Sequence, residues 1–374
     1  MRFTNLSAIF SIFAVVAATS LARGATNALS FTSSKWIWTS TTTANAAVIL
    51  RKDFTPPLGK SLIAAEILIA ADDQFSLYVN NELVGSAANA NGFAQTFCVD
   101  LQPSYNVFAV NASTSASSNG AIIATLLLTY SDGMTTSTVV SDCSWRVSPA
   151  AGLPSNWAGL DFDDTAWSTA TVAGAFGAQP WGQVAIPSGG STLTLAGTQW
   201  VWTNIVAPGG QALPISTRAF RRTITLPSGQ SAAGANILIT ADDAYTLYVN
   251  GVQVGSGSSW EVAQHYVVNF SSEPNEIVFA VLGNNTVDNS PAGIIVAAEI
   301  NLTPSGRAGS IGCSAGLFAS TDTNWVSTKG TIPSGWEQPG FDDSAWPAVV
   351  DEAVYGTAVW GAVPVQAALA PVTV

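Results

Sequence analysis

The sequence is nearly devoid of histidine, and this narrows the chemistry open to it. His265 is the only histidine in 374 residues. Hydrolases built on a nucleophile, a base and an acid usually take histidine as the base, and zinc sites mostly combine histidine with clustered cysteines. The three cysteines, Cys98, Cys143 and Cys313, lie far apart in the chain. The sequence therefore disfavours a catalytic triad and a zinc centre.

Charged residues are also few, and basic residues are the fewest. Asp and Glu number 24 against 12 Lys and Arg, and charged residues make up 10% of the chain. The net charge of −12 repels nucleic acid and anionic membranes, so we expect neither as a partner. Such a weakly charged surface suits an extracellular protein.

One apolar run at the N-terminus has the features of a targeting segment. Arg2 precedes an apolar stretch over residues 8–19, and a small-x-small cleavage site ends at Ala22. This pattern predicts a secretory signal peptide over residues 1–22, because the run is too short for a stable membrane span. No later stretch is long and apolar enough to cross a bilayer. We therefore expect a secreted, extracellular protein without a membrane span.

Glycosylation sequons agree with secretion. Four Asn-x-Ser/Thr sequons predict N-linked glycans at Asn111, Asn269, Asn284 and Asn301. Sequons also arise by chance, so they support the prediction of secretion without carrying it.

The most informative feature that the sequence does contain is a long internal repeat. Residues 67–86 read ILIAADDQFSLYVNNELVGS and residues 237–256 read ILITADDAYTLYVNGVQVGS, an offset of 237 − 67 = 170 residues. KWIW, NVFAV and FDDTAW return in the same order as QWVW, IVFAV and FDDSAW. Solenoid repeats are only about 20–50 residues long. The period therefore predicts two tandem domains, over residues 30–186 and 196–366, joined near residues 185–197.

Short β runs separated by turn residues indicate the fold class. FSLYV alternates, with Phe75, Leu77 and Val79 on one face, and Asn250-Gly251 is a strong two-residue hairpin turn. No long segment has a clear 3.6-residue period. The sequence predicts an all-β protein with two tandem β-sandwich domains of the jelly-roll type.

Several motifs recur in both copies. They are the opening W-x-W, an Arg-rich strand at residues 51–54 and 221–224, the hairpin A-D-D-x-[FY]-x-L-Y-V-N, and F-D-D-[ST]-A-W. With these motifs each copy resembles the galactose-binding-domain-like jelly roll that accompanies α-L-rhamnosidases and related glycoside hydrolases as an accessory domain. Because no catalytic barrel follows in the sequence, the resemblance implies the accessory module without the enzyme.

The paired aspartates allow three interpretations. The D-D-x-x-x-L-Y-V piece is also similar to calcium-dependent adhesin domains of the PA14 type, which implies calcium ligands at Asp72, Asp73, Asp242 and Asp243. The alternative is turn and cap chemistry, with each Asp satisfying nearby backbone N–H groups. Catalysis by two facing carboxyls is the third. Neighbours in an extended chain point to opposite faces, so a single Asp-Asp pair is not expected to form such a site. Apart from calcium we expect no cofactor.

Tryptophan usage separates shared fold from individual function. Twelve of the 13 tryptophans fall into pairs that occur in both copies, which predicts packing roles. The pairs are Trp36/Trp200, Trp38/Trp202, Trp145/Trp325, Trp157/Trp336, Trp167/Trp346 and Trp181/Trp360.

Trp260 is the exception, because Ala90 stands at its counterpart position. Flat aromatic rings stack on the apolar faces of sugars, and polar neighbours surround this one; the alternative is a Trp that covers a loop edge. We predict a ligand site in the second copy that includes Trp260, Glu261, His265 and Tyr245.

Two cysteines are peculiar to the first copy. Val267 and Thr323 stand at the positions that correspond to Cys98 and Cys143. Their joint absence from the second copy predicts a Cys98–Cys143 disulfide in a secreted protein. Cys313 is then either buried and free or paired between chains.

Together these features favour a secreted, non-catalytic, lectin-like protein that binds extracellular or cell-wall glycans. A secreted glycoside hydrolase or lyase, and a structural interaction protein without a sugar site, remain alternatives. The near absence of histidine favours a binding or structural protein over an enzyme.

Overall fold

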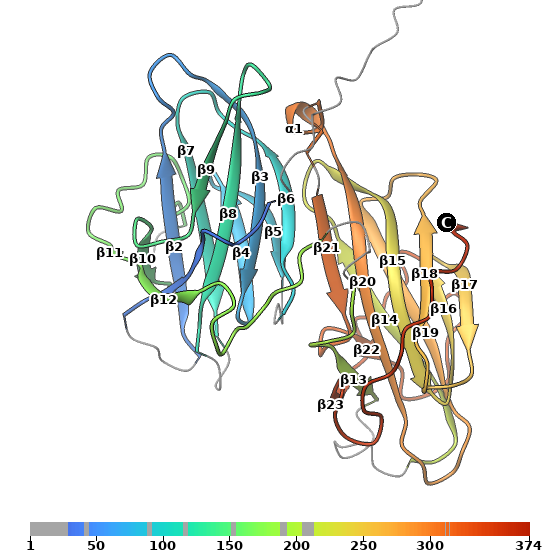
Figure 1. Ribbon diagram of the computed structural model, residues 1–374. Coiled ribbons are helices and arrows are strands. Elements are labelled where there is room, and N and C mark those ends of the chain that lie inside the picture. Colours follow the sequence, from blue (N-terminus) through green and yellow to red (C-terminus); the bar gives the residue numbers. More distant parts are fainter. Residues whose placement is uncertain are drawn as a thin grey trace, which may run out of the picture.

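The computed structural model describes residues 29–40, 45–87, 92–114, 119–150, 155–187, 193–203, 213–310, 312–313 and 315–374. The predicted signal peptide and residues 188–192 of the predicted linker lie outside this part. The described chain is built of β-strands with one short helix, α1 (Gly306–Ser310), which confirms the all-β prediction. Two sandwiches lie side by side, the first blue to green and the second yellow to red (Figure 1). In the described part no helix is long and apolar enough to cross a membrane.

The first sandwich packs two antiparallel sheets. One has the order β12-β1-β8-β3-β6, with β9 beside β8, and the other has the order β11-β10-β2-β7-β4-β5. The strands are β1 (Lys35–Trp38), β2 (Ala47–Phe54), β3 (Leu62–Ala71), β4 (Gln74–Val79), β5 (Glu82–Ala87), β6 (Gln95–Asp100), β7 (Asn106–Ser113), β8 (Ile122–Tyr130), β9 (Thr136–Val140), β10 (Arg146–Pro149), β11 (Ser168–Thr169) and β12 (Thr171–Ala175).

The second sandwich repeats this plan. One sheet has the order β21-β20-β15-β18-β24, with β13 beside β20 and β23 beside β13, and the other has the order β17-β16-β19-β14-β22. The strands are β13 (Gln199–Trp202), β14 (Ser216–Thr225), β15 (Gln230–Asp242), β16 (Ala244–Val249), β17 (Val252–Gly257), β18 (Gln264–Asn269), β19 (Glu276–Asn285), β20 (Gly293–Pro304), β21 (Ala315–Ser320), β22 (Val326–Ser327), β23 (Val350–Val354) and β24 (Val372–Thr373). β24 pairs with β18 beyond residue 366, where the sequence predicted the domain to end.

The hairpin pattern builds the core as predicted. Phe75, Leu77 and Val79 of β4 all point into the buried cluster between the sheets. The following turn has φ of 53° at Asn80 and 73° at Asn81. Two consecutive positive φ values are what a type I′ hairpin turn requires, and Asn is among the few residues that tolerate them.

Matched tryptophans occupy matched places, which confirms the duplication. Trp36 stacks on Trp181 with ring centroids 5.2 Å apart, and Trp200 stacks on Trp360 at 4.5 Å. Each stack covers the outer face of its sheet. An edge-on contact also recurs, in the pairs Tyr78–Trp157 and Tyr248–Trp336.

Each domain also buries one arginine of the Arg-rich strand beneath its FDD loop. Arg51, 0% exposed, donates to Asp164 Oδ2 at 3.0 Å and to the carbonyls of Trp157 and Gly159 at 2.9 Å. In the second domain Arg221 makes the equivalent bonds, to Asp343 and to the carbonyls of Trp336 and Gln338. The second aspartate of each FDD motif is therefore the counter-ion of a buried guanidinium.

The first aspartate of each FDD motif serves the turn. Asp163 Oδ1 accepts the backbone N–H of Thr165 at 3.0 Å, and Asp342 Oδ1 accepts that of Ser344 at 3.1 Å. These bonds lower the pKa of both carboxyls, with the hydroxyls of Thr165 and Ser344 contributing most. Asp163 and Asp342 therefore act as turn residues that satisfy nearby backbone N–H groups.

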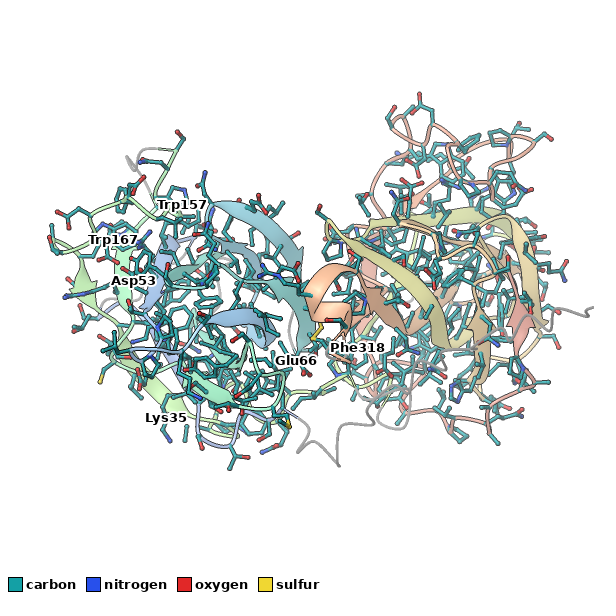
Figure 2. The ribbon with its side chains drawn as sticks, turned by 90° about the horizontal axis from the view of Figure 1, so that it is seen from above. Lys35, Asp53, Glu66, Trp157, Trp167 and Phe318 are labelled. Carbon is teal, nitrogen blue, oxygen red and sulfur yellow. A yellow bond between two sulfur atoms is a disulfide. The ribbon has the colours of Figure 1, made fainter. Side chains whose placement is uncertain are left out.

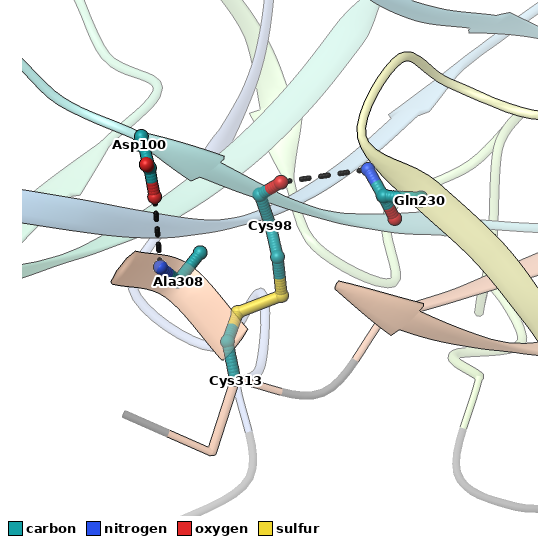
Figure 3. Close-up of a disulfide and its surroundings, with 5 residues drawn as sticks. All are labelled: Cys98, Asp100, Gln230, Ala308 and Cys313. Carbon is teal, nitrogen blue, oxygen red and sulfur yellow. Dashed lines mark hydrogen bonds between the residues drawn. A yellow bond between two sulfur atoms is a disulfide. The ribbon is translucent and has the colours of Figure 1, made fainter. Parts of the chain in front are cut away.

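The predicted Cys98–Cys143 disulfide is wrong. Cys98 in β6 is bonded to Cys313, with Cα atoms 6.2 Å apart, and Cys143 is free and exposed (Figure 3). β6 is the strand of the first domain that meets the second, so its cysteine reaches across the junction. A cysteine that bridges the copies has no counterpart within either copy, which is why comparing the copies suggested the wrong partner.

Candidate functional site

The outer face of β15 is where the structure places two of the four predicted ligand residues, Trp260 and His265. Residues Asn236, Leu238, Thr240 and Asp242 alternate with residues of the sandwich core, so they share this face. The Thr240 hydroxyl donates to the Ser259 carbonyl at 2.9 Å. Asp242 Oδ2 accepts the indole N–H of Trp360 at 2.8 Å. The strand thus holds both the loop before Trp260 and the Trp200–Trp360 stack.

Trp260 and His265 lie over the same face. Trp260 is half-buried and packs against the cluster that contains Leu238 and Trp360. His265 of β18 is directly opposite Leu238, and its Nε2 lies 3.2 Å from Asn236 Oδ1. Burial lowers the pKa of His265, which favours the neutral ring. From Leu238 to Asp242 the strand rises about 13 Å.

Asp242 and Asp243 form a carboxyl pair at the end of this face. Their carboxyl groups lie within hydrogen-bonding reach of each other, and the peptide bond between them is cis. Our expectation that neighbouring aspartates point to opposite faces does not hold here. It assumed a regular extended chain, whereas β15 ends at Asp242 and the chain turns into β16.

Their environments shift the pKa values of the two carboxyls in opposite directions. Burial, against the Trp360 hydrogen bond and together with the neighbouring Asp243, raises the pKa of Asp242, which is 7% exposed, to about 6. Burial also opposes ionisation of Asp243. The Thr286 N–H and hydroxyl, which donate to Asp243 Oδ2 at 2.7 and 2.8 Å, outweigh this effect and lower the pKa of Asp243.

This pair suits a hard cation only in part. Calcium prefers carboxylate and carbonyl oxygens and takes six to eight ligands. Asp242 and Asp243 supply two carboxylates at one point. Within the described residues, however, no group of three or more His, Cys, Asp or Glu side chains gathers around a common centre. Further ligands would therefore be backbone carbonyls, waters or ligand hydroxyls.

Within the described residues, the first domain keeps counterparts of Asp242, Asp243 and Trp360 in Asp72, Asp73 and Trp181. Asp73 is 9% exposed and Asp72 is partly buried. The Trp181 indole N–H has no hydrogen-bond partner in the part of the chain described, whereas its counterpart Trp360 bonds to Asp242. Residues 88–91 and 115–118, which correspond to the loops around Trp260 and Thr286, lie outside the described residues.

The prediction that Tyr245 contacts a ligand is wrong. Tyr245 is 2% exposed, and its hydroxyl lies 3.1 Å from the hydroxyl of Tyr266 between the two sheets. It occupies the same inward position in β16 as Phe75 does in β4. The alternation that predicted the hairpin therefore also excluded this residue from the surface. Glu261, by contrast, is exposed beside Trp260.

The sequons differ in accessibility. Asn269 is exposed, whereas Asn111, Asn284 and Asn301 are partly buried in strands. Asn284 Oδ1 also accepts the hydroxyl of Thr217 at 2.7 Å. Glycosylation stays a prediction, and Asn269 is the sequon whose side chain is best placed for it.

Comparisons with known proteins bear on this site. No protein-family model matches the chain. An α-L-rhamnosidase from Streptomyces avermitilis is 32% identical over 237 residues. The predicted resemblance to rhamnosidase accessory domains is confirmed. The match covers 60% of this chain but only 21% of that enzyme, so the chain spans about a fifth of its length.

Two solved structures are also similar. A lectin from Pleurotus ostreatus in complex with GalNAc is 35% identical, with 89% of this chain and 94% of the lectin covered and a TM-score of 0.41. The Streptomyces avermitilis α-L-rhamnosidase complexed with L-rhamnose is 22% identical, with 87% of this chain and 32% of the enzyme covered and a TM-score of 0.38.

Two residues of the site, Trp360 and Thr286, were not predicted from the sequence to belong to it. Trp360 was assigned to packing because Trp181 matches it, and the pairing gave no sign that only Trp360 bonds to an aspartate. Thr286 was noted only as part of a sequon. Its proximity to Asp243 depends on the connection between β19 and β20, which sequence spacing does not reveal.

Proposed function

We propose that this is a secreted carbohydrate-binding protein whose principal sugar site is the outer face of β15 in the second domain. The observation that carries the proposal is the interacting carboxyl pair Asp242–Asp243 at the end of the face that also holds Trp260 and His265. Similarity to an enzyme named for its action on rhamnosides supports the ligand class. Glycosidases separate their two carboxyls by about 5–9 Å across the scissile bond, whereas Asp242 and Asp243 are neighbours in the chain whose carboxyls interact, which favours binding over hydrolysis.

Each group has a distinct role in this proposal. The exposed part of the Trp260 ring stacks on the apolar face of a sugar, and the neutral His265 ring can donate or accept a hydrogen bond. Asp243, only partly buried, accepts from sugar hydroxyls. Asp242 is held by Trp360 and fixes the position of its neighbour. Tryptophan and carboxylate together therefore select a ring with one apolar face and adjacent hydroxyls.

A glycan array tests the proposal, with GalNAc- and L-rhamnose-terminated glycans as the first probes. These are the sugars in the two similar solved structures. Binding of a defined glycan that survives washing, followed by a saturable isotherm, would support it. Absence of binding to every glycan on a broad array, by folded protein, would refute it.

Replacing Trp260 should weaken glycan binding selectively. Stacked aromatics contribute about 1–3 kcal/mol in nucleic-acid recognition, so Trp260→Ala should lower the affinity by about tenfold or more. Trp260→Phe keeps a ring and should retain most of the binding. Because the ring is half-buried, thermal melts of both variants serve as the folding control. Unchanged affinity in folded Trp260→Ala would remove this residue from the site.

We also propose calcium as a ligand of the Asp242–Asp243 pair. Since an ion that binds only the folded state stabilises it, millimolar calcium should raise the melting temperature relative to EDTA. Asp243→Asn should abolish most of the rise, and Asp73→Asn reports the contribution of the first domain. An identical melting temperature in calcium and EDTA would leave Asp72, Asp73, Asp242 and Asp243 with structural roles only.

A further inference from the structure

The two domains enclose a cleft of about 540 Å³ that the proposed sugar site does not use. Residues 83–87 line it from the first domain, and residues 222–228 and 317–320 line it from the second. Figure 2 shows Phe318 at the boundary between the domains, far from Trp157 and Asp53. The volume lies within the range of about 300–1,000 Å³ that is typical of ligand sites.

The cleft runs along strand edges. Each of the three lining segments is continuous in sequence, without alternate residues missing. Because successive side chains of a strand point to opposite faces, a cleft over a face would be lined by every second residue. Continuous lining therefore places the edges of β5, β14 and β21 on its walls.

Two of those edges, on β5 and β14, carry little pairing in the described part of the chain. β5 is the last strand of its sheet, and the second edge of β14 pairs with β22 only at Phe220 and Arg221. The third edge is not free: β21 pairs with β6 at Gly316, and the Gln95 side chain bonds both the N–H and the carbonyl of Phe318, so the unpaired edges are those of β5 and β14. Unpaired strand edges are templates for an added strand.

Contacts between the two domains hold these edges at a fixed spacing before any ligand binds. One pair of sheets is already continuous through β6 and β21, and the Cys98–Cys313 disulfide closes the same junction. Asp100 accepts the N–H of Ala308 at 2.8 Å, and the Gln230 amide donates to the Cys98 carbonyl at 3.4 Å (Figure 3). A ligand therefore enters a cleft that needs little ordering, which lowers the entropic cost of binding.

The lining indicates an uncharged occupant. Its two charged side chains, Arg222 and Asp322, have opposite signs and interact, so the cleft adds no net charge to a protein of net charge −12. Leu83, 52% exposed, and the Phe318 ring present apolar surface, and hydroxyl residues complete the walls. We infer that the cleft binds an extended, uncharged polypeptide segment as an additional β-strand between the two domains.

The duplication supplies a matched control. β17 is the counterpart of β5 in the second domain and is likewise the last strand of its sheet, but it does not line the cleft. Ser86 of β5 and Ser256 of β17 are equivalent, since they pair with Ser76 and Thr246. Both side chains are exposed. A bulky charge at Ser86 should block the cleft, and the same change at Ser256 should not.

Selection of seven-residue peptides by phage display on the full-length protein provides the probe. The best sequence, made as a fluorescent peptide, is titrated by fluorescence polarisation. Ser86→Lys and, from the opposite wall, Thr225→Lys should each weaken binding by at least tenfold, while Ser256→Lys leaves it unchanged; thermal melts confirm folding. Two further peptides carry N-methyl groups, one at the odd-numbered and one at the even-numbered residues. At least one of them should lose binding, because N-methylation removes the backbone N–H donors that an added β-strand needs.

Several results would overturn the inference. They are failure to select any peptide over the Ser86→Lys background, equal binding by wild type and Ser86→Lys, and unimpaired binding of both N-methylated peptides. Loss of glycan binding in Ser86→Lys without any peptide binding would instead assign the cleft to a sugar. Because the peptide titration does not use the sugar site at Asp242 and Trp260, its outcome is independent of the proposed function.

Discussion

Replacing Cys98 or Cys313 with serine should lower the stability of the native protein by about 2–5 kcal/mol. The bridge joins residues 215 apart in sequence, so it restricts a long loop in the unfolded chain. In the chain-entropy description the restriction grows with the length of that loop. Reduction of the wild-type disulfide should have the same effect as either substitution.

The free cysteine provides the control. Cys143 is exposed and unbonded, so Cys143→Ser should keep the wild-type unfolding midpoint in guanidinium chloride, whereas Cys98→Ser and Cys313→Ser shift it downward together. A midpoint that falls in Cys98→Ser and Cys143→Ser but not in Cys313→Ser would restore the pairing that the copies suggested. Mass mapping of the non-reduced protein identifies the bonded pair directly.

Replacing Arg221 with methionine should destabilise the second domain by about 3–5 kcal/mol. The side chain is 1% exposed and donates to Asp343 and to two backbone carbonyls of the loop that covers it. Methionine fills a similar volume but leaves these acceptors without their donor. Breaking a buried ion pair from one side is costly, because the remaining charge stays desolvated.

Arg218 of the same strand is a suitable comparison. It is partly exposed and has no carboxylate partner among the described residues, so Arg218→Met should change the unfolding free energy by no more than about 0.5 kcal/mol. Arg51→Met should reproduce the Arg221 effect in the first domain. If Arg221→Met is no less stable than Arg218→Met in urea, the buried guanidinium does not hold the FDD loop.

Local patterns predicted the fold because the features that determine it are local. Alternation in FSLYV and the Asn-Asn and Asn-Gly turns fix each hairpin within a few residues. Because the domain is duplicated, each of these patterns occurs twice in the sequence. The FDD aspartates that pair with Arg51 and Arg221 are more than 100 residues away, and those pairings were not predicted. The disulfide was mispredicted for the same reason, since Cys313 belongs to the other copy.

The site was predictable where the copies differ and unpredictable where they agree. Trp260 and His265 stood out because the first copy lacks them, and the structure places both over β15. Trp360 was assigned to packing alone because Trp181 occupies the same position in the first copy. The contact between Asp242 and Asp243 depends on the backbone at the end of β15, which residue types alone do not specify.

Hydrogen exchange with and without a bound glycan tests the central claim most directly. With a glycan from the array at saturation, amide exchange should slow in residues 240–243 and 258–265, at the outer face of β15, and at Thr286, which bonds to Asp243. Asp243→Asn should abolish this protection. Protection confined to the first domain or to residues 83–87 and 222–228, with none around Asp242 and Trp260, would contradict a sugar site on β15.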